Sequence, residues 1–464
     1  MSDLSFMTLH ELSDAIARKA ISPVELLDDV IARYESLEPR LNMFVHVDFE
    51  SARREAQASE ARVMAGERLG RLDGIPTSIK DLIAVGGMPQ RSGSRATNDA
   101  PVATDAPAVR RLRASGAVIL GKSTTTEFGC KAVSNSPLTG ITRNPWNTAL
   151  TTGGSSCGAA AMVAAGLVPY AIGTDGGGSV RIPAAMCGLF GIKAQFGRVP
   201  VFPTSATPTL AHVGPLARNA EDAAIVLSTI AGFDGHDPFA VREDLPSFRP
   251  AAKPLHAMKI AWSPTLGYGR IDPDVAALAE RAVSTIAEMG VDVNLVETVM
   301  DDPIDLWTAE FYAGVGTRLR DTVATQPDLL DPVVLDLLTD ALEQDMRSYY
   351  ESVFARYAFR EKMRAFFEEY DLLLTPTVPV TAFGAELDIP PGYEDKNAVS
   401  WATFTYPFNL TGQPAASLPV GFTGAGLPVG LQAVAASHDE ASIFALAAAY
   451  QAHAPDDRRP DIGS

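Results

Sequence analysis

Glycine, serine and threonine are dense between residues 151 and 181, where the sequence reads TTGGSSCGAAAMVAAGLVPYAIGTDGGGSVR. Two glycine-rich loops, at residues 153–158 and 173–179, flank a run of small apolar residues. Glycine permits backbone conformations and close approaches to a ligand that other residues do not, and consecutive N–H groups can converge on a developing oxyanion. Ser179 directly follows three glycines. Its hydroxyl is therefore a candidate nucleophile toward a carbonyl carbon held by those N–H groups.

A serine nucleophile needs a base. None of the seven histidines lies in an HExxH or HxH arrangement or beside a nucleophile elbow, so a Ser-His-Asp triad has poor support and each histidine is interpreted as a surface or core residue. Lysine is the other candidate, because a buried lysine can be neutral near pH 7. Lys80 ends the short apolar segment GIPTSIKD at residues 74–81. Taken alone, it could equally be a surface lysine.

The glycine-rich loops also have structural interpretations. Residues 173–178 follow an apolar segment but do not fit the GxGxxG pattern of a dinucleotide-binding turn. A plain turn would explain one such loop, whereas two loops that both carry serine favour a site.

The same residues resemble the amidase signature family. In that family GGSS is followed by GTDxGGSxRxPAAxCGxxGxK, as here at residues 153–156 and 173–193. The resemblance covers most of the chain and is weakest at residues 235–370. Its other matching segments are GIPTSIKD at 74–81, NPWN at 144–147, DLLLTPT at 371–377, NLTGQP at 409–414 and GLPVGLQ at 426–432.

The resemblance implies a Ser-Ser-Lys triad. Ser179 matches the acylated nucleophile and Lys80 matches the terminal base. Ser155, the first serine of GGSS, matches the serine between them, which in the family follows a cis peptide bond. The oxyanion hole matches the backbone N–H groups of Gly176, Gly177 and Gly178 with that of Ser179. The family's chemistry needs no metal and no organic cofactor.

Some positions depart from the family pattern or lie beside the motifs. Gly176 stands where the family usually has Thr, Ser or Ile, and Cys157 replaces the small residue after GGSS. Cys157 and Cys187 are interpreted as packed core residues. Asp175 and Arg181 are expected to form an ion pair that braces the nucleophile loop.

The substrate pocket is expected to use the loop around Gly129 and Cys130 and the helices at 300–350. Trp307, Phe311 and Tyr312 could line that pocket or belong to the core.

The composition is that of a globular protein. The chain has 464 residues, 46% hydrophobic and 20% charged, and a net charge of −18. This charge argues against nucleic acid or an anionic membrane as a partner, because phosphate binding needs clustered Lys and Arg. Three cysteines are too few for a disulfide framework. The polar N-terminal segment shows no secretion signal, so a cytoplasmic location is expected.

Alternating apolar segments and glycine-rich loops predict an α/β fold, as one large domain with a central mixed sheet covered by helices. Four regions are expected: helical residues 1–70, a signature core at 71–235, a variable and mainly helical substrate-side region at 236–370, and a return to the core sheet at 371–455. Strands are predicted at 117–120, 168–172 and 259–262, and helices at 49–65, 103–115, 157–166 and 274–289.

The predicted function is hydrolysis of the C–N bond of a carboxylic amide, or of a hydrazide or aryl ester, through an acyl-enzyme. The substrate is expected to be a small molecule, and a homodimer is one option for the assembly. One alternative is the amidase subunit of a tRNA-dependent glutamine amidotransferase. Those relatives usually carry Asp-Gln before a Gly-Pro pair, where this chain reads AHVGP at 211–215. The other alternative is a non-catalytic binding protein on the same scaffold.

Overall fold

The computed structural model describes residues 4–242 and 254–462. Within them, eleven strands form one mixed sheet in the order β1-β3-β2-β8-β10-β9-β14-β15-β13-β11-β12. The strands are β1 (Phe44–Val47), β2 (Pro76–Lys80), β3 (Val118–Ser123), β8 (Tyr170–Asp175), β9 (Phe190–Lys193), β10 (His212–Ala217), β11 (Lys259–Trp262), β12 (Asp292–Leu295), β13 (Leu372–Pro376), β14 (Ala415–Phe422) and β15 (Pro428–Ala435). Two small hairpins, β4 (Asn135–Ser136) with β5 (Gly140–Ile141) and β6 (Arg143–Asn144) with β7 (Asn147–Thr151), lie outside it.

Thirteen α-helices accompany the sheet in the described residues. They are α1 (Leu9–Ala17), α2 (Pro23–Leu41), α3 (Phe49–Ala65), α4 (Pro107–Ala114), α5 (Cys157–Ala164), α6 (Arg181–Cys187), α7 (Ala220–Ile230), α8 (Pro273–Glu288), α9 (Ile304–Thr325), α10 (Pro332–Leu342), α11 (Met346–Glu369), α12 (Pro407–Thr411) and α13 (Glu440–His453).

Local signals explain the helix ends. Ser22 caps α2, Pro23 occupies its first turn, and the Glu25 side chain completes a capping box. Helix α3 ends at Gly66 in the left-handed conformation that glycine adopts readily. Helix α4 begins later than predicted, at Pro107, because proline is well suited to the first helical turn and lacks the N–H that a helix interior needs.

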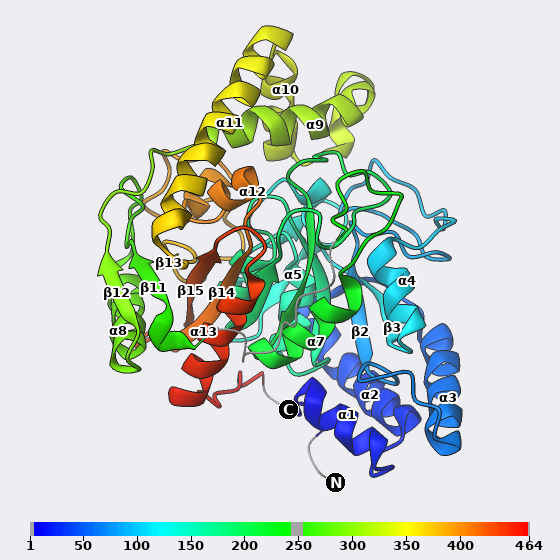
Figure 1. Cartoon of the computed structure of the whole chain (residues 1–464). Helices are drawn as coiled ribbons and strands as arrows, with labels where there is room; N and C mark the ends of the chain where they lie inside the picture. Colours follow the sequence, from blue (N-terminus) through cyan, green and yellow to red (C-terminus); the bar gives the residue numbers. More distant parts are fainter. Residues whose placement is uncertain (1–3, 243–253, 463–464) are drawn as a thin grey trace.

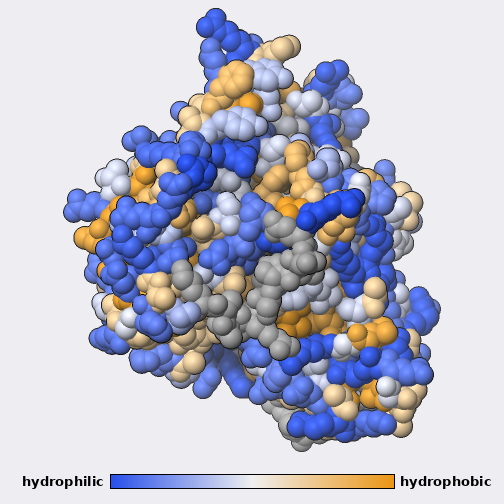
Figure 2. All heavy atoms as spheres, in the orientation of Figure 1, coloured by the Kyte–Doolittle hydropathy of each residue, from blue (hydrophilic) through white to orange (hydrophobic). Residues whose placement is uncertain are grey.

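Helices cover both faces of the sheet (Figure 1). Helices α7, α8 and α13 pack on one face and α5 and α6 on the other, while α9, α10 and α11 project from one edge of the body. Hydrophilic side chains cover most of the surface seen in Figure 2, in keeping with the buried apolar clusters beneath. The predicted α/β class and mixed sheet are confirmed.

Strands β2 and β8 place the site. They are parallel neighbours with Ile79 opposite Ile172, so their carboxyl ends lie at the same edge of the sheet. Lys80 is the last residue of β2, and the glycine-rich loop begins directly after Asp175 of β8. Ligands of open α/β sheets usually bind at this edge.

The string GAVILGKS at residues 116–123 has the letters of a phosphate-binding loop. Here residues 118–123 are the buried strand β3, and the Lys122 ammonium pairs with Asp81 at 2.9 Å. An extended, buried segment of this kind has no loop with which to hold a phosphate.

Candidate active site

Lys80 is fully buried at the end of β2. Its Nζ donates a hydrogen bond to Ser155 Oγ at 2.7 Å and faces the carbonyl oxygen of Thr174 at 3.4 Å. Burial disfavours the charged ammonium and lowers the pKa of Lys80 to about 7, although the carboxylate of Asp175 favours the charged form. A lysine with this pKa exchanges protons readily near neutrality.

Ser155 lies in the turn before α5, after a cis peptide bond from Gly154. Gly154 is required there, because a Cβ would lie 1.8 Å from the carbonyl oxygen of Val133. The Gly154 N–H donates to the carbonyl of Ala132. The contacts of Gly154 fix the backbone directly before Ser155, and the Ser155 hydroxyl lies next to Lys80 and Gly129.

The loop after β8 carries Ser179. The Trp307 indole donates to the carbonyl of Gly176 at 2.8 Å, and the Thr405 hydroxyl donates to that of Gly177 at 2.7 Å. The Gly178 N–H donates to Asp175 Oδ1 at 2.8 Å. This N–H is therefore not free to bind an oxyanion, and the predicted oxyanion hole has one donor fewer than expected. Within residues 4–242 and 254–462, the N–H groups of Gly176, Gly177 and Ser179 have no acceptor.

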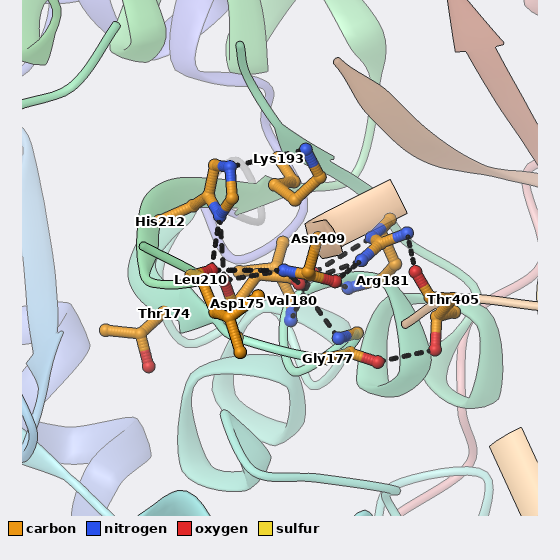
Figure 3. Close-up of polar contacts among 12 residues, drawn as sticks. Thr174, Asp175, Gly177, Val180, Arg181, Lys193, Leu210, His212, Thr405 and Asn409 are labelled. Atoms are coloured by element: carbon orange, nitrogen blue, oxygen red, sulfur yellow. Dashed lines mark hydrogen bonds and ion pairs between the residues drawn. The ribbon is translucent and has the colours of Figure 1, made fainter. Parts of the chain in front are cut away.

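A buried ion pair braces this loop, as Figure 3 shows. Arg181 donates to both carboxylate oxygens of Asp175, at 2.8 and 2.9 Å, and neither side chain is exposed to solvent. Asn409, Gln432 and the carbonyl of Thr405 accept the remaining Arg181 N–H groups. Burial alone would raise the pKa of Asp175, but Arg181 and the Asn409 amide hold it well below its usual range.

We expect the substitution Asp175→Asn to lower the free energy of unfolding by about 3–5 kcal/mol, because Arg181 would stay buried without a counter-charge. Urea denaturation followed by circular dichroism measures this change. Asp99→Asn is the matched control, since its carboxylate is 80% exposed where it pairs with Arg91 and should contribute about 1 kcal/mol or less. Equal effects of the two substitutions would contradict a bracing role for Asp175.

His212 is a neighbour that the sequence did not single out. Its Nδ1 lies 2.7 Å from the carbonyl of Leu210 and 3.2 Å from that of Asp175, and Lys193 Nζ lies 3.4 Å from its Nε2. Burial, together with the charge of Lys193, lowers the pKa of His212 well below its usual value. The ring is neutral at pH 7 and ties β10 to the start of the nucleophile loop. The one signal in the sequence that could have pointed to His212 is its position in the segment AHVGP at 211–215, which follows the signature motif.

Ser155 and Ser179 open onto one cavity of about 380 Å³. Its wall is made by residues 82–84, by the loop at 200–207 and by one side of α9. Gly129, in the single-turn helix η1 (Glu127–Gly129), lines the cavity, and its role in binding substrate stays a prediction. The side chain of Cys130 is not part of this wall but is buried in the core, with the Tyr312 hydroxyl donating to its backbone carbonyl.

The three cysteines are buried, and burial raises the pKa of each thiol. They are therefore poor nucleophiles beside the serine pair.

Among the described residues no group of three His, Cys, Asp or Glu side chains could hold a metal ion. In the same residues, no helix combines the length and apolar character that a membrane crossing requires.

The family model described as Amidase matches residues 25–444. The chain belongs to the amidase family. An acylamidase of Rhodococcus erythropolis is 34% identical over 475 residues, covering 99% of this chain and 98% of the relative. A glutamyl-tRNA(Gln) amidotransferase subunit of Moorella thermoacetica is also 34% identical, over 489 residues and 99% of both chains. Percentage identity therefore does not separate the hydrolase from the amidotransferase subunit.

Solved structures agree with this membership. A bacterial aryl acylamidase of the amidase signature family superposes with a TM-score of 0.92, 29% identity and 99% coverage of both chains. A 6-aminohexanoate cyclic dimer hydrolase bound to its substrate gives a TM-score of 0.91, with 28% identity and 99% coverage of both chains. The predicted family and fold are confirmed, and the protein is an amidase.

Gly176, where the amidase departs from the family pattern, lies beside Phe311 of α9. A Cβ at Gly176 would lie 2.9 Å from the ring of Phe311 on α9, so the aromatic side chain fills the space of the usual larger residue. Phe311 stacks on Trp307 with ring centroids 4.4 Å apart. Of the three aromatic residues that were left open as liners or core, Phe311 faces the cavity, Trp307 donates to the nucleophile loop, and Tyr312 is buried in the core.

Proposed function

We propose that this amidase cleaves the C–N bond of a small carboxylic amide through an acyl-enzyme on Ser179, with Ser155 and Lys80 as a proton relay. The observation that carries this proposal is the 2.7 Å contact between the buried Lys80 Nζ and Ser155 Oγ, at the wall of a cavity that also exposes Ser179. Hydrolysis of aryl and alkyl amides by the purified chain tests it.

In the proposed reaction, neutral Lys80 accepts the Ser155 hydroxyl proton across their hydrogen bond, while Ser155 takes the proton of Ser179. The Ser179 oxygen attacks the amide carbonyl, and the N–H groups of Gly176, Gly177 and Ser179 stabilise the oxyanion. The tetrahedral intermediate collapses as Ser155 returns a proton to the leaving amine. Water then attacks the acyl-enzyme by the reverse relay and releases the acid.

The dependence of kcat/KM on pH should follow the deprotonation of Lys80. Because the neutral amine is the base and the pKa of Lys80 is lowered to about 7, kcat/KM should be constant above about pH 8 and fall about tenfold per pH unit below 7. Initial rates on one amide between pH 4 and 10 measure this, with circular dichroism at each pH as the control for folding. A profile that is flat down to pH 4 would exclude a lysine base.

The amidotransferase alternative predicts a different requirement. Ala211 and His212 stand where those relatives usually carry Asp-Gln, which favours the independent hydrolase. Full amidase activity of the purified chain by itself would support this choice, whereas activity that depends on added partner subunits would support the alternative.

A binding protein without catalysis would not be acylated. Covalent labelling of the wild type by a fluorophosphonate, and its loss in Ser179→Ala, would distinguish the enzyme from such a binding protein.

Pairing into a homodimer, the absence of nucleic-acid or membrane partners and a cytoplasmic location stay predictions. The first is measured by light scattering of the purified protein.

A further inference from the structure

Three titratable side chains reach the wall of the active-site cavity: Asp175, His212 and Arg318. Asp175 is neutralised by Arg181, and the His212 ring is uncharged. Arg318, on α9, has no carboxylate within 4.0 Å among the described residues. Arg318 is itself exposed to solvent, so the cavity has at its mouth one guanidinium that forms no ion pair with a carboxylate of the described residues.

Backbone groups fix the position of this guanidinium. Arg318 Nη2 donates to the carbonyl of Thr204 at 2.6 Å and to that of Ser205 at 3.1 Å, and both residues line the same cavity. The other N–H groups of Arg318 make no hydrogen bond within the described ranges. An arginine held in this way loses little conformational freedom when it binds an anion, and its free N–H groups match a carboxylate.

Helix α9 sets the distance between this charge and the nucleophile. Phe311 touches Gly176 of the nucleophile loop, and Arg318 follows seven residues later, about 10 Å along the helix. The wall also carries apolar side chains, Val315 and Leu319 from α9 and Phe202 from the facing loop, beside the hydroxyl-bearing residues Ser205 and Thr207. The cavity thus offers apolar side chains in addition to the nucleophile loop and the Arg318 guanidinium.

We propose that the substrate is an amide with an apolar, ring-sized body that ends in a carboxylate, and that Arg318 binds this carboxylate at the far end of the cavity from Ser179. The proposal rests on the proposed function, since it assumes that the amide reacts at Ser179. Arg318 then acts in substrate selection and contributes mainly to KM, because it lies about two helical turns from the reacting carbonyl.

The test compares matched substrates that differ in charge alone. para-Acetamidophenylpropanoate and the corresponding neutral alcohol place the group on the amine side of the scissile bond. para-Carbamoylphenylpropanoate and its alcohol place it on the acyl side. On at least one pair, the wild type should favour the carboxylate by about tenfold or more in kcat/KM, through a lower KM.

Arg318→Gln should bring that ratio close to one, because glutamine can still donate to the loop carbonyls but has no charge. Arg318→Lys should retain part of the preference. Arg320→Gln is the matched control, since Arg320 lies on the same helix, is 71% exposed, contacts Asp321 and does not line the cavity. This control should keep the wild-type ratio.

Two outcomes would overturn the proposal. One is a wild-type ratio near one on both pairs. The other is an Arg318→Gln enzyme in which both members of a pair lose activity equally. That result would mean that Arg318 only stabilises the loop at 204–205 and does not bind the substrate. If instead neither pair reacts and a fluorophosphonate fails to label Ser179, the proposed function itself fails.

Discussion

Replacing Ser179 by Ala is expected to abolish amide hydrolysis, with kcat falling by about 10⁴-fold or more, while the fold is kept. Ser179 follows the glycine loop, is partly exposed to the cavity and has no structural hydrogen bond through its hydroxyl in the described residues. Its loss should therefore remove the nucleophile and leave the packing unchanged. Steady-state rates and the thermal unfolding midpoint measure the two effects.

Mass spectrometry of the intact protein provides the control for this result. A slowly hydrolysed substrate should leave one acyl group on the wild type and on Cys157→Ala, but none on Ser179→Ala. An adduct that maps to Cys157 or Cys187 would contradict the assignment of Ser179.

Lys80→Ala and Ser155→Ala are each expected to reduce kcat by several orders of magnitude, or about 4–7 kcal/mol of transition-state stabilisation. Lys80 contacts Ser155 directly at 2.7 Å, and in the proposed relay it reaches Ser179 only through Ser155. Removing either residue interrupts the same proton path. Residues that act as a unit give strongly non-additive losses, so the double variant should be scarcely slower than the slower single variant.

The four proteins should be compared on a matched amide and ester. Esters should lose less in both single variants, because an alkoxide or phenoxide leaving group needs less protonation than an amine. Unfolding midpoints verify that each variant is folded, which matters for a lysine that is fully buried. Additive losses in the double variant would mean that Lys80 acts by another route and would exclude the relay.

The sequence by itself determined the local elements and the family. Residues 49–65 and 259–262 form α3 and β11 with the predicted ends, because caps and apolar periodicity act over a few neighbouring residues. The long signature motif identified Ser155, Ser179 and Lys80 as candidates without any knowledge of their separation in space. Strand β1 was missed, since the four residues FVHV between two helices are too short for a clear pattern.

Tertiary structure decided which of these residues meet. Lys80 and Ser155 are 75 positions apart in sequence, and they meet because α5, with the turn before it, packs against β2. Besides Asp175, the partners of Arg181 come from positions 405, 409 and 432, and two of them lie in or beside α12, more than 200 residues away along the chain. Side-chain burial and strand order depend on the whole packed chain, so no local pattern encodes them.

The cavity is likewise a property of the tertiary structure. Gly129 and Cys130 are adjacent in sequence, yet one lines the cavity and the other is buried in the core. Asp175 occupies the Gly178 N–H, which a count of consecutive glycines could not foresee. The position of Arg318 opposite the loop at 200–207 follows from how α9 packs on the body. Short motifs thus indicated the type of chemistry. Long-range packing determined which backbone N–H groups of the nucleophile loop stay without an acceptor and which charged side chain, Arg318, reaches the cavity.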